Sequence, residues 1–212
     1  RMGLLQPHVR YGGGDGQADL SYLAMRAARP NLMMLAVAGF VSATAIAAFA
    51  LSDAATGLSV EPPEPYRAEV MGAGRYDVAF GVISTTGQPP VAGTSPALCK
   101  IVFKKAFRAE PVEQKLLNQR FLDEGWLKSM RREYTPSLNI QREETFVQGD
   151  MLGIELTTIP KAGPNASQVR VHVSILETTK GRMVQTCATP EASFDGALAE
   201  FRKIRSTITL PK

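Results

Sequence analysis

The residues that could carry chemistry in this chain of 212 residues are few and widely spaced. Cys99 and Cys187 are its two cysteines, and His8 and His172 are its two histidines. A thiol or serine nucleophile needs a histidine base beside it, and a zinc site needs ligands at short spacings. The sequence contains no Cys-x-x-Cys, no Gly-x-Ser-x-Gly and no glycine-rich phosphate-binding loop. We therefore expect no catalytic residue, no metal site and no cofactor.

Carboxylates are the other candidates for chemistry, since two of them together can serve as acid and base. Two adjacent pairs occur, Asp123 with Glu124 and Glu143 with Glu144. Neighbouring side chains on a helix or a strand point in different directions, so neither pair is expected to act jointly. His172 lies in a segment with the periodicity of a strand, and we expect it to be a partly exposed residue of a sheet.

The most distinctive element of the sequence is an uncharged stretch from residue 30 to residue 52. As a helix, the segment from Leu32 to Leu51 would span about 30 Å, which is the thickness of the hydrocarbon core of a bilayer. Pro30 suits the first helical turn, where a backbone N–H would have no partner. The sequence therefore predicts a transmembrane helix over residues 30–52, with the lipid bilayer as its surroundings.

Basic residues are distributed unequally around this predicted span. The residues before it include Arg1, Arg10, Arg26 and Arg29, whereas the first charged residue after it is Asp53. Basic residues close to a span remain in the cytoplasm. Residues 1–29 are therefore predicted to be a short cytoplasmic leader and residues 53–212 to lie outside. We interpret the leader and composition as bacterial, which places the protein in the inner membrane as a single-pass protein with a periplasmic C-terminal domain.

Two other interpretations of the apolar stretch remain open. Ala48, Phe49 and Ala50 form a small-x-small site that resembles the cleavage site of an export signal, although the leader and the apolar run are long for one. A buried core helix is the other interpretation, but a helix that is apolar on every side needs a large protein shell.

One face of the predicted span is made of small residues. Gly39, Ala43 and Ala47 follow one another at intervals of four, and Ser42 lies beside them. Small side chains let a second membrane helix approach closely, so these four residues are candidate helix-packing positions. The partners would be other membrane-protein subunits. Alanine-rich spans also contain such spacings by chance.

Cys99 and Cys187 both fall on the side that the charge distribution places outside. Two cysteines in an oxidising compartment usually form a disulfide. We therefore predict a structural bridge between these residues, which are 88 positions apart.

The segment after the predicted span divides into two parts. Residues 53–75 include Glu61-Pro62-Pro63-Glu64-Pro65 and predict an extended, proline-rich spacer. Residues 76–212 predict an extracytoplasmic α+β domain. Alternating apolar residues indicate strands near residues 76–82, 99–103, 151–159, 169–175 and 182–188, of which the last three should form an antiparallel meander.

Two helices are expected to pack on this mainly antiparallel sheet. The first covers residues 111–134 with a bend at Gly125. The second carries an apolar stripe that begins at Phe194, and Thr189 and Pro190 should supply its cap and first turn. The predicted fold class is therefore α+β, with one N-terminal transmembrane helix followed by the outer domain.

Charge argues against nucleic acid as a partner. The chain has a net charge of +4, but from Asp53 onward it contains 20 basic and 18 acidic residues. Such a balance lacks the strong positive field that binds phosphate backbones.

These observations predict a non-catalytic, single-pass membrane protein that acts as an accessory or scaffold subunit of a larger bacterial inner-membrane complex. The alternative is a membrane-tethered periplasmic domain that binds a small ligand or an envelope polymer in a groove between sheet and helix. An anchored enzyme is a third hypothesis, which requires a pocket joining His172 to a carboxylate. An exposed apolar patch over a filled core would favour the scaffold, and an apolar pocket with converging polar groups would favour the ligand.

Overall fold

The computed structural model describes residues 50–93, 95–107, 110 and 112–211. The predicted leader (1–29) and the helix-packing positions Gly39, Ser42, Ala43 and Ala47 lie outside these ranges. Within them, no helix is both long and apolar enough to cross a membrane.

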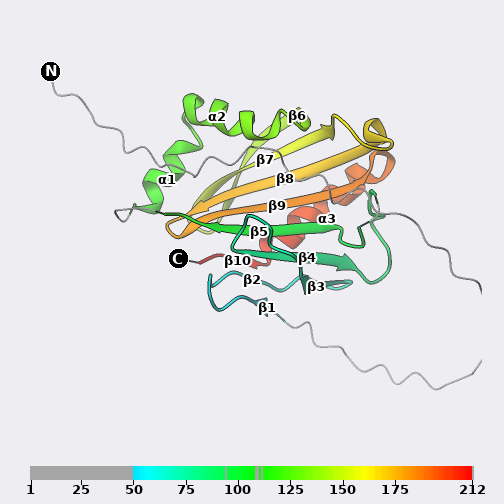
Figure 1. Ribbon diagram of the computed structural model, residues 1–212, viewed down its shortest axis with the longest axis horizontal. Coiled ribbons are helices and arrows are strands. Elements are labelled where there is room, and N and C mark those ends of the chain that lie inside the picture. Colours follow the sequence, from blue (N-terminus) through cyan, green and yellow to red (C-terminus); the bar gives the residue numbers. More distant parts are fainter. Residues whose placement is uncertain (1–49, 94, 108–109, 111, 212) are drawn as a thin grey trace, which may run out of the picture.

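A seven-stranded antiparallel sheet forms the centre of the domain (Figure 1). Its strand order is β3-β4-β5-β9-β8-β7-β6, and each strand runs antiparallel to its neighbours. The strands are β3 (Tyr66–Val70), β4 (Val78–Ser84), β5 (Cys99–Lys105), β6 (Leu138–Gln148), β7 (Met151–Pro160), β8 (Val169–Thr178) and β9 (Gly181–Pro190). The prediction of a mixed α+β domain with a mainly antiparallel sheet is confirmed, as is the meander of the three strands β7, β8 and β9.

The two faces of this sheet are covered by different helices. Helices α1 (Gln114–Arg120) and α2 (Glu124–Tyr134) lie on one face, and α3 (Phe194–Ser206) lies on the other, where Figure 1 shows it behind the sheet. Strand alternation separates two cores: Val173 and Ile175 pack with the α1–α2 side, while Leu176 packs with α3. In the described part of the chain, two 3₁₀ turns, η2 (Ala166–Gln168) and η3 (Glu191–Ser193), accompany these helices.

A small second sheet lies beside the main one, and its first strand occupies the predicted end of the transmembrane helix. It consists of β1 (Leu51–Ser52), β2 (Ser59–Val60) and β10 (Ile208–Thr209). Leu51 pairs with Val60, so a helix cannot continue to residue 52 as predicted. The turn after β1 closes on Asp53, whose carboxylate accepts a hydrogen bond of 2.7 Å from the Thr56 N–H. The predicted span from residue 30 to residue 49 lies outside the described ranges.

The predicted spacer over residues 53–75 is also wrong, because this segment belongs to the folded domain. Leu58 and Val60 are completely buried, and Tyr66 begins the edge strand β3. Prolines occupy only the connection between β2 and β3, where no ladder hydrogen bond is needed. Burial of the flanking apolar side chains holds the segment against the main core.

The helices also differ from the predictions in their boundaries. The expected helix over 111–134 is two helices, because Asp123 caps α2 by accepting a hydrogen bond of 2.7 Å from the Trp126 N–H. Gly125 lies in the first turn of α2 and is not the junction. Thr189 and Pro190 end β9 instead of capping α3, and the Thr189 hydroxyl donates to the Pro90 carbonyl. Three helices, not two, pack on the sheet of the described domain.

Strand β6 was not among the predicted elements. Its alternation is irregular because a bulge between Ile140 and Arg142 shifts the register against β7. Its position at the edge of the sheet leaves one side of the strand exposed, so that charged residues are tolerated there.

Candidate functional site

The predicted disulfide between Cys99 and Cys187 is present and buried in the main core. The two residues face each other on the adjacent strands β5 and β9, with their Cα atoms 4.0 Å apart. The Ala188 N–H donates to the Leu98 carbonyl, which makes the cysteines a non-hydrogen-bonded pair, the register in which antiparallel side chains come closest. The bridge therefore links strands that are distant in sequence and adjacent in space.

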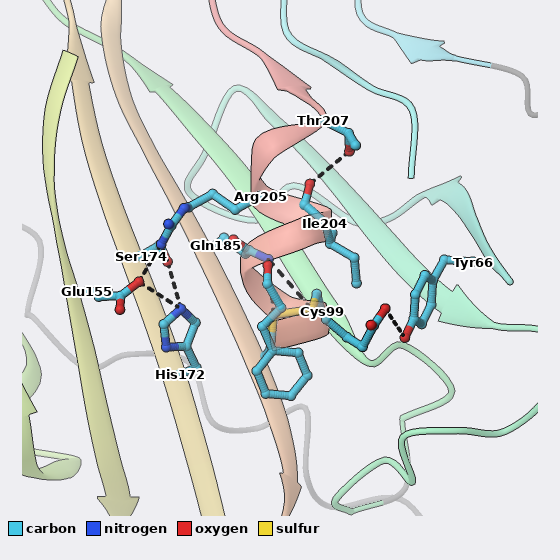
Figure 2. The surroundings of a disulfide bond; sticks show 12 residues. Tyr66, Cys99, Glu155, His172, Ser174, Gln185, Ile204, Arg205 and Thr207 are labelled. Carbon is cyan, nitrogen blue, oxygen red and sulfur yellow. Dashed lines mark hydrogen bonds and ion pairs between the residues drawn. A yellow bond between two sulfur atoms is a disulfide. The ribbon is translucent and has the colours of Figure 1, made fainter. Parts of the chain in front are cut away.

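Gln185 connects this disulfide to helix α3 (Figure 2). Its side-chain Nε2 donates to the Phe201 carbonyl at 3.0 Å and lies 3.2 Å from the Cys187 sulfur. Because Gln185 is completely buried, these contacts offset the cost of removing its amide group from water. They also hold the middle of α3 against β9.

A buried cluster of polar and charged side chains lies beside the disulfide, on the same face of the sheet. Figure 2 shows Glu155 of β7, His172 and Ser174 of β8 and Arg205 of α3 converging under the helix. The Ser174 hydroxyl lies 2.9 Å from His172 Nε2, and the same nitrogen lies 3.8 Å from a Glu155 oxygen. Arg205 forms an ion pair with Glu155 and donates to the Ser174 hydroxyl at 3.2 Å. We call these four residues the buried polar cluster.

Burial and charge determine the protonation of this cluster. Burial lowers the pKa of His172 to about 4, against the opposing effect of Glu155 and with a further decrease from the two arginines of α3. Burial alone would raise the pKa of Glu155, but hydrogen bonds from Arg202 and Arg205 lower it below its usual value. At neutral pH the cluster therefore contains a neutral imidazole beside an ionised, paired carboxylate.

The geometry of the cluster differs from that of a Ser-His-acid triad. In a triad, one imidazole nitrogen contacts the serine and the other is oriented by the acid. Here Ser174 and Glu155 both approach Nε2, and His172 Nδ1 has no hydrogen-bond partner within the described part of the chain. All four side chains are also buried beneath α3. The arrangement connects α3 to the sheet and offers a substrate no access to its atoms.

The prediction that His172 would be partly exposed is wrong. Sequence reasoning also missed Glu155, which stands in an otherwise apolar strand and is buried. The available signal was the recurrence of polar residues on one face of neighbouring strands, together with Arg202 and Arg205 spaced three apart on an amphipathic helix.

The adjacent carboxylates point apart, as predicted. Glu143 accepts hydrogen bonds from Arg131 of α2, while Glu144 is paired across the other face with Arg202 of α3. Asp123 caps α2, and Glu124 is an exposed partner of Arg131. Each of these carboxylates therefore has a structural partner, and the two members of a pair do not share a site.

A groove of about 470 Å³ opens at the surface between α3 and the loops that flank β3 and β4. Pro65, Pro89 and Pro90 of these loops line it, and we call these three residues the proline wall. Gly196 and Ala197 from the first turns of α3 also line the groove, together with several polar side chains. This volume lies in the range of ligand sites, which is about 300 to 1,000 Å³.

Tyr66 forms part of the groove floor. Its hydroxyl donates to Glu200 at 3.2 Å, and burial together with this carboxylate raises its pKa to about 12. Glu200 also forms an ion pair with Lys203 at 3.4 Å. These contacts tie β3 to α3 and keep the Tyr66 phenol a hydrogen-bond donor even above the ordinary pKa of tyrosine, about 10.

Comparisons with known proteins establish the fold but no family. No family model matches the chain, and no curated protein matches its sequence. The cyanobacterial PsbP protein (CyanoP) of Synechocystis sp. PCC 6803 is similar in structure, with a TM-score of 0.50, 12% identity and coverage of 81% of this chain and 98% of CyanoP. The domain therefore shares the fold of that protein.

Two further solved structures show weaker similarity, at TM-scores too low to support an argument. A protein of unknown function from Pseudomonas aeruginosa, described as a putative regulator, has a TM-score of 0.41, 9% identity and coverage of 77% of this chain and 96% of its own. A protein from Bacteroides thetaiotaomicron has a TM-score of 0.34, 14% identity and coverage of 73% of this chain and 45% of its own.

Proposed function

We propose that this chain is a non-catalytic, single-pass membrane protein that serves as an accessory or scaffold subunit of a larger bacterial inner-membrane complex. Its N-terminal apolar helix would anchor it, and its folded domain would bind partner subunits on the periplasmic side.

The observation that carries this proposal is the burial of the one histidine of the domain inside the polar cluster. His172 and its neighbours Glu155 and Ser174 are covered by α3, and each has a structural contact in the cluster. Both faces of the sheet are filled by helices. The imidazole, carboxylate and hydroxyl of these three residues thus stabilise the packing of α3 on the sheet, which suits a binding protein better than an enzyme.

A periplasmic location is supported by the disulfide and by the charges around the apolar segment. A buried bridge such as Cys99–Cys187 forms and persists in oxidising compartments. Four arginines precede the apolar segment, and acidic Asp53 follows it. A reporter enzyme fused after Lys212 should be active in the periplasm and not in the cytoplasm. Activity in the cytoplasm would overturn this topology.

The interaction through the membrane can be tested by purifying the full chain in mild detergent and identifying co-purifying proteins by mass spectrometry. Replacing Gly39 and Ala43 by leucine should remove stoichiometric partners, because larger side chains prevent close helix approach. Val41→Leu, two positions from both and therefore on the opposite side of the predicted helix, is the matched control and should retain them. Isolation of the wild-type chain without partners would overturn the proposal.

A second candidate function is binding of a small ligand or an envelope polymer. The groove between α3 and the proline-bearing loops favours it, because its volume is adequate and polar side chains border an apolar wall. Titration of the full chain with soluble peptidoglycan fragments would test it. A saturable rise in melting temperature would support this function, and an unchanged melting temperature would contradict it.

A further inference from the structure

Gly196 is a glycine that neither the backbone nor the packing of α3 requires. Its φ is not in the left-handed region, and a Cβ atom added there would meet no other atom within 4 Å. Glycine inside a helix costs up to about 1 kcal/mol relative to alanine. The residue is exposed and forms part of the wall of the groove. Its effect is to leave the backbone of α3 bare where a ligand can approach closely.

The loops that carry the proline wall are held in place by hydrogen bonds within the domain. Both the N–H and the hydroxyl of Thr85 donate to the Pro65 carbonyl, at 2.9 and 2.7 Å. The Ser84 hydroxyl donates to the Gln88 carbonyl at 2.5 Å. These contacts join the loop before β3 to the loop after β4. A wall that is already ordered reduces the entropy lost on binding.

The charges around the groove favour a positively charged occupant. Glu200 is already paired with Lys203 and with the Tyr66 hydroxyl. Glu64, which also borders the groove, is exposed and has no ion pair with another described residue. A basic group placed beside Glu64 would give this carboxylate a partner of opposite charge.

We propose that this groove binds an extended segment of a partner protein that carries a basic side chain. An open groove with an apolar proline wall fits a chain that lies along it, whereas small ligands usually bind where most of their surface is enclosed. The backbone of the segment would pass over Gly196, and its lysine or arginine would pair with Glu64. This inference rests on the proposed function, which supplies the reason for a protein partner.

The test uses the full chain in detergent and fluorescently labelled short peptides as probes. The peptides contain alternating proline and alanine around one central arginine, and a matched set has glutamate in place of arginine. Fluorescence anisotropy should show micromolar binding of the arginine peptides. Gly196→Leu should weaken this binding by about tenfold or more, because a Cβ atom at this exposed position meets no domain atom within 4 Å and the larger side chain would take up space in the groove.

Two further variants separate steric and electrostatic effects. Ala199→Leu adds the same side chain to an exposed position of α3 that does not line the groove, and it should leave binding unchanged. Glu64→Lys should abolish binding of the arginine peptides and allow binding of the glutamate peptides. Thermal denaturation of each variant should show an intact fold, since positions 64, 196 and 199 are all exposed.

The outcomes distinguish this inference from the proposed function. If no peptide binds, or if Gly196→Leu binds as tightly as the wild type, the groove inference is wrong. If peptidoglycan fragments bind and no peptide does, the second candidate function is supported and the groove inference is wrong. Co-purification of partners with the full chain would support the subunit role in either case. Peptide binding by a chain that never co-purifies with a partner would support the groove inference and contradict the subunit role.

Discussion

Arg205 of α3 and Glu155 of β7 form an ion pair beneath the helix, where both side chains are almost completely excluded from solvent. Arg202, one turn earlier on α3, reaches the same carboxylate from the partly exposed side. Two arginines of one helix thus hold a single buried glutamate of the sheet. The pairing determines where α3 lies relative to β7 and β8.

Removal of the Glu155 carboxylate should strongly destabilise the domain. Glu155→Gln leaves Arg205 charged and buried without its partner, and losses of this kind are about 3 to 5 kcal/mol. Glu144→Gln, which removes a more exposed partner of Arg202, should cost less than about 1 kcal/mol. Urea denaturation of both variants measures the difference. Equal losses would show that the buried pair has no special role.

Stability should decrease on acidification because of His172. Its pKa is lowered in the folded state from the ordinary 6.5 to about 4, so the unfolded chain binds a proton first. The decrease should begin near pH 6.5, continue to about pH 4, and reach about 3 kcal/mol.

The contribution of His172 can be separated from that of Glu155. The pKa of Glu155 is lowered from an ordinary value of 4.5, so its contribution is present above that value and is lost as the pH falls further. His172→Gln should therefore flatten the profile of unfolding free energy between pH 6.5 and 4.5. A slope identical to that of the wild type in this range would contradict a neutral, buried histidine.

The disulfide should make a large contribution to stability and resist modification in the folded state. In the loop-entropy model, a bridge across 88 residues restricts the unfolded chain by about 4 to 5 kcal/mol. The double variant Cys99→Ala and Cys187→Ala should lose a free energy of this order in urea denaturation. Alkylation under non-reducing conditions should label no thiol in the wild type. Two labelled thiols would contradict the bridge.

Gly181 at the start of β9 should not tolerate a side chain. A Cβ atom at this position would lie 2.2 Å from the Lys104 carbonyl oxygen on the neighbouring strand. Because both atoms belong to paired backbones, relief requires separation of β5 and β9, and overpacking costs about 1 to 3 kcal/mol or more. Gly181→Ala should lower the melting temperature by several degrees, whereas Gly196→Ala should leave it unchanged or raise it. The opposite order would contradict the close approach of the strands.

Sequence reasoning predicted most of the long strands of the folded domain, its last helix and its α+β class. Period-two alternation predicted β4, β5, β7, β8 and β9, because each strand buries apolar side chains on a face of the sheet. The α3 stripe was predicted from Phe194 to Ile208 for the same reason, although the helix ends at Ser206 and Ile208 belongs to β10. Such patterns are visible in one sequence, since they depend only on neighbours within a few residues. Strand β3 was missed because it lies in the segment predicted to be a spacer, and the irregular β6 and the short strands β1, β2 and β10 carried no such pattern.

The disulfide pairing also followed from the sequence, because two cysteines allow only one intramolecular bridge. The burial of His172, by contrast, depends on contacts with β7 and α3, which are distant along the chain. Local alternation assigns His172 to the face opposite Val173 but does not reveal what covers that face.

The sequence by itself therefore determined the strands and the helix with a regular apolar period, the distribution of the charges and the pairing of the two cysteines. Only the tertiary structure decided that Glu155, His172 and Arg205 meet under α3 and that Gly196 lines the same groove as the proline wall. The physical reason is that strand order and helix docking arise from burial and pairing between segments far apart in the chain. Those interactions have no periodic signature in the sequence, and they exist only once the layers have packed.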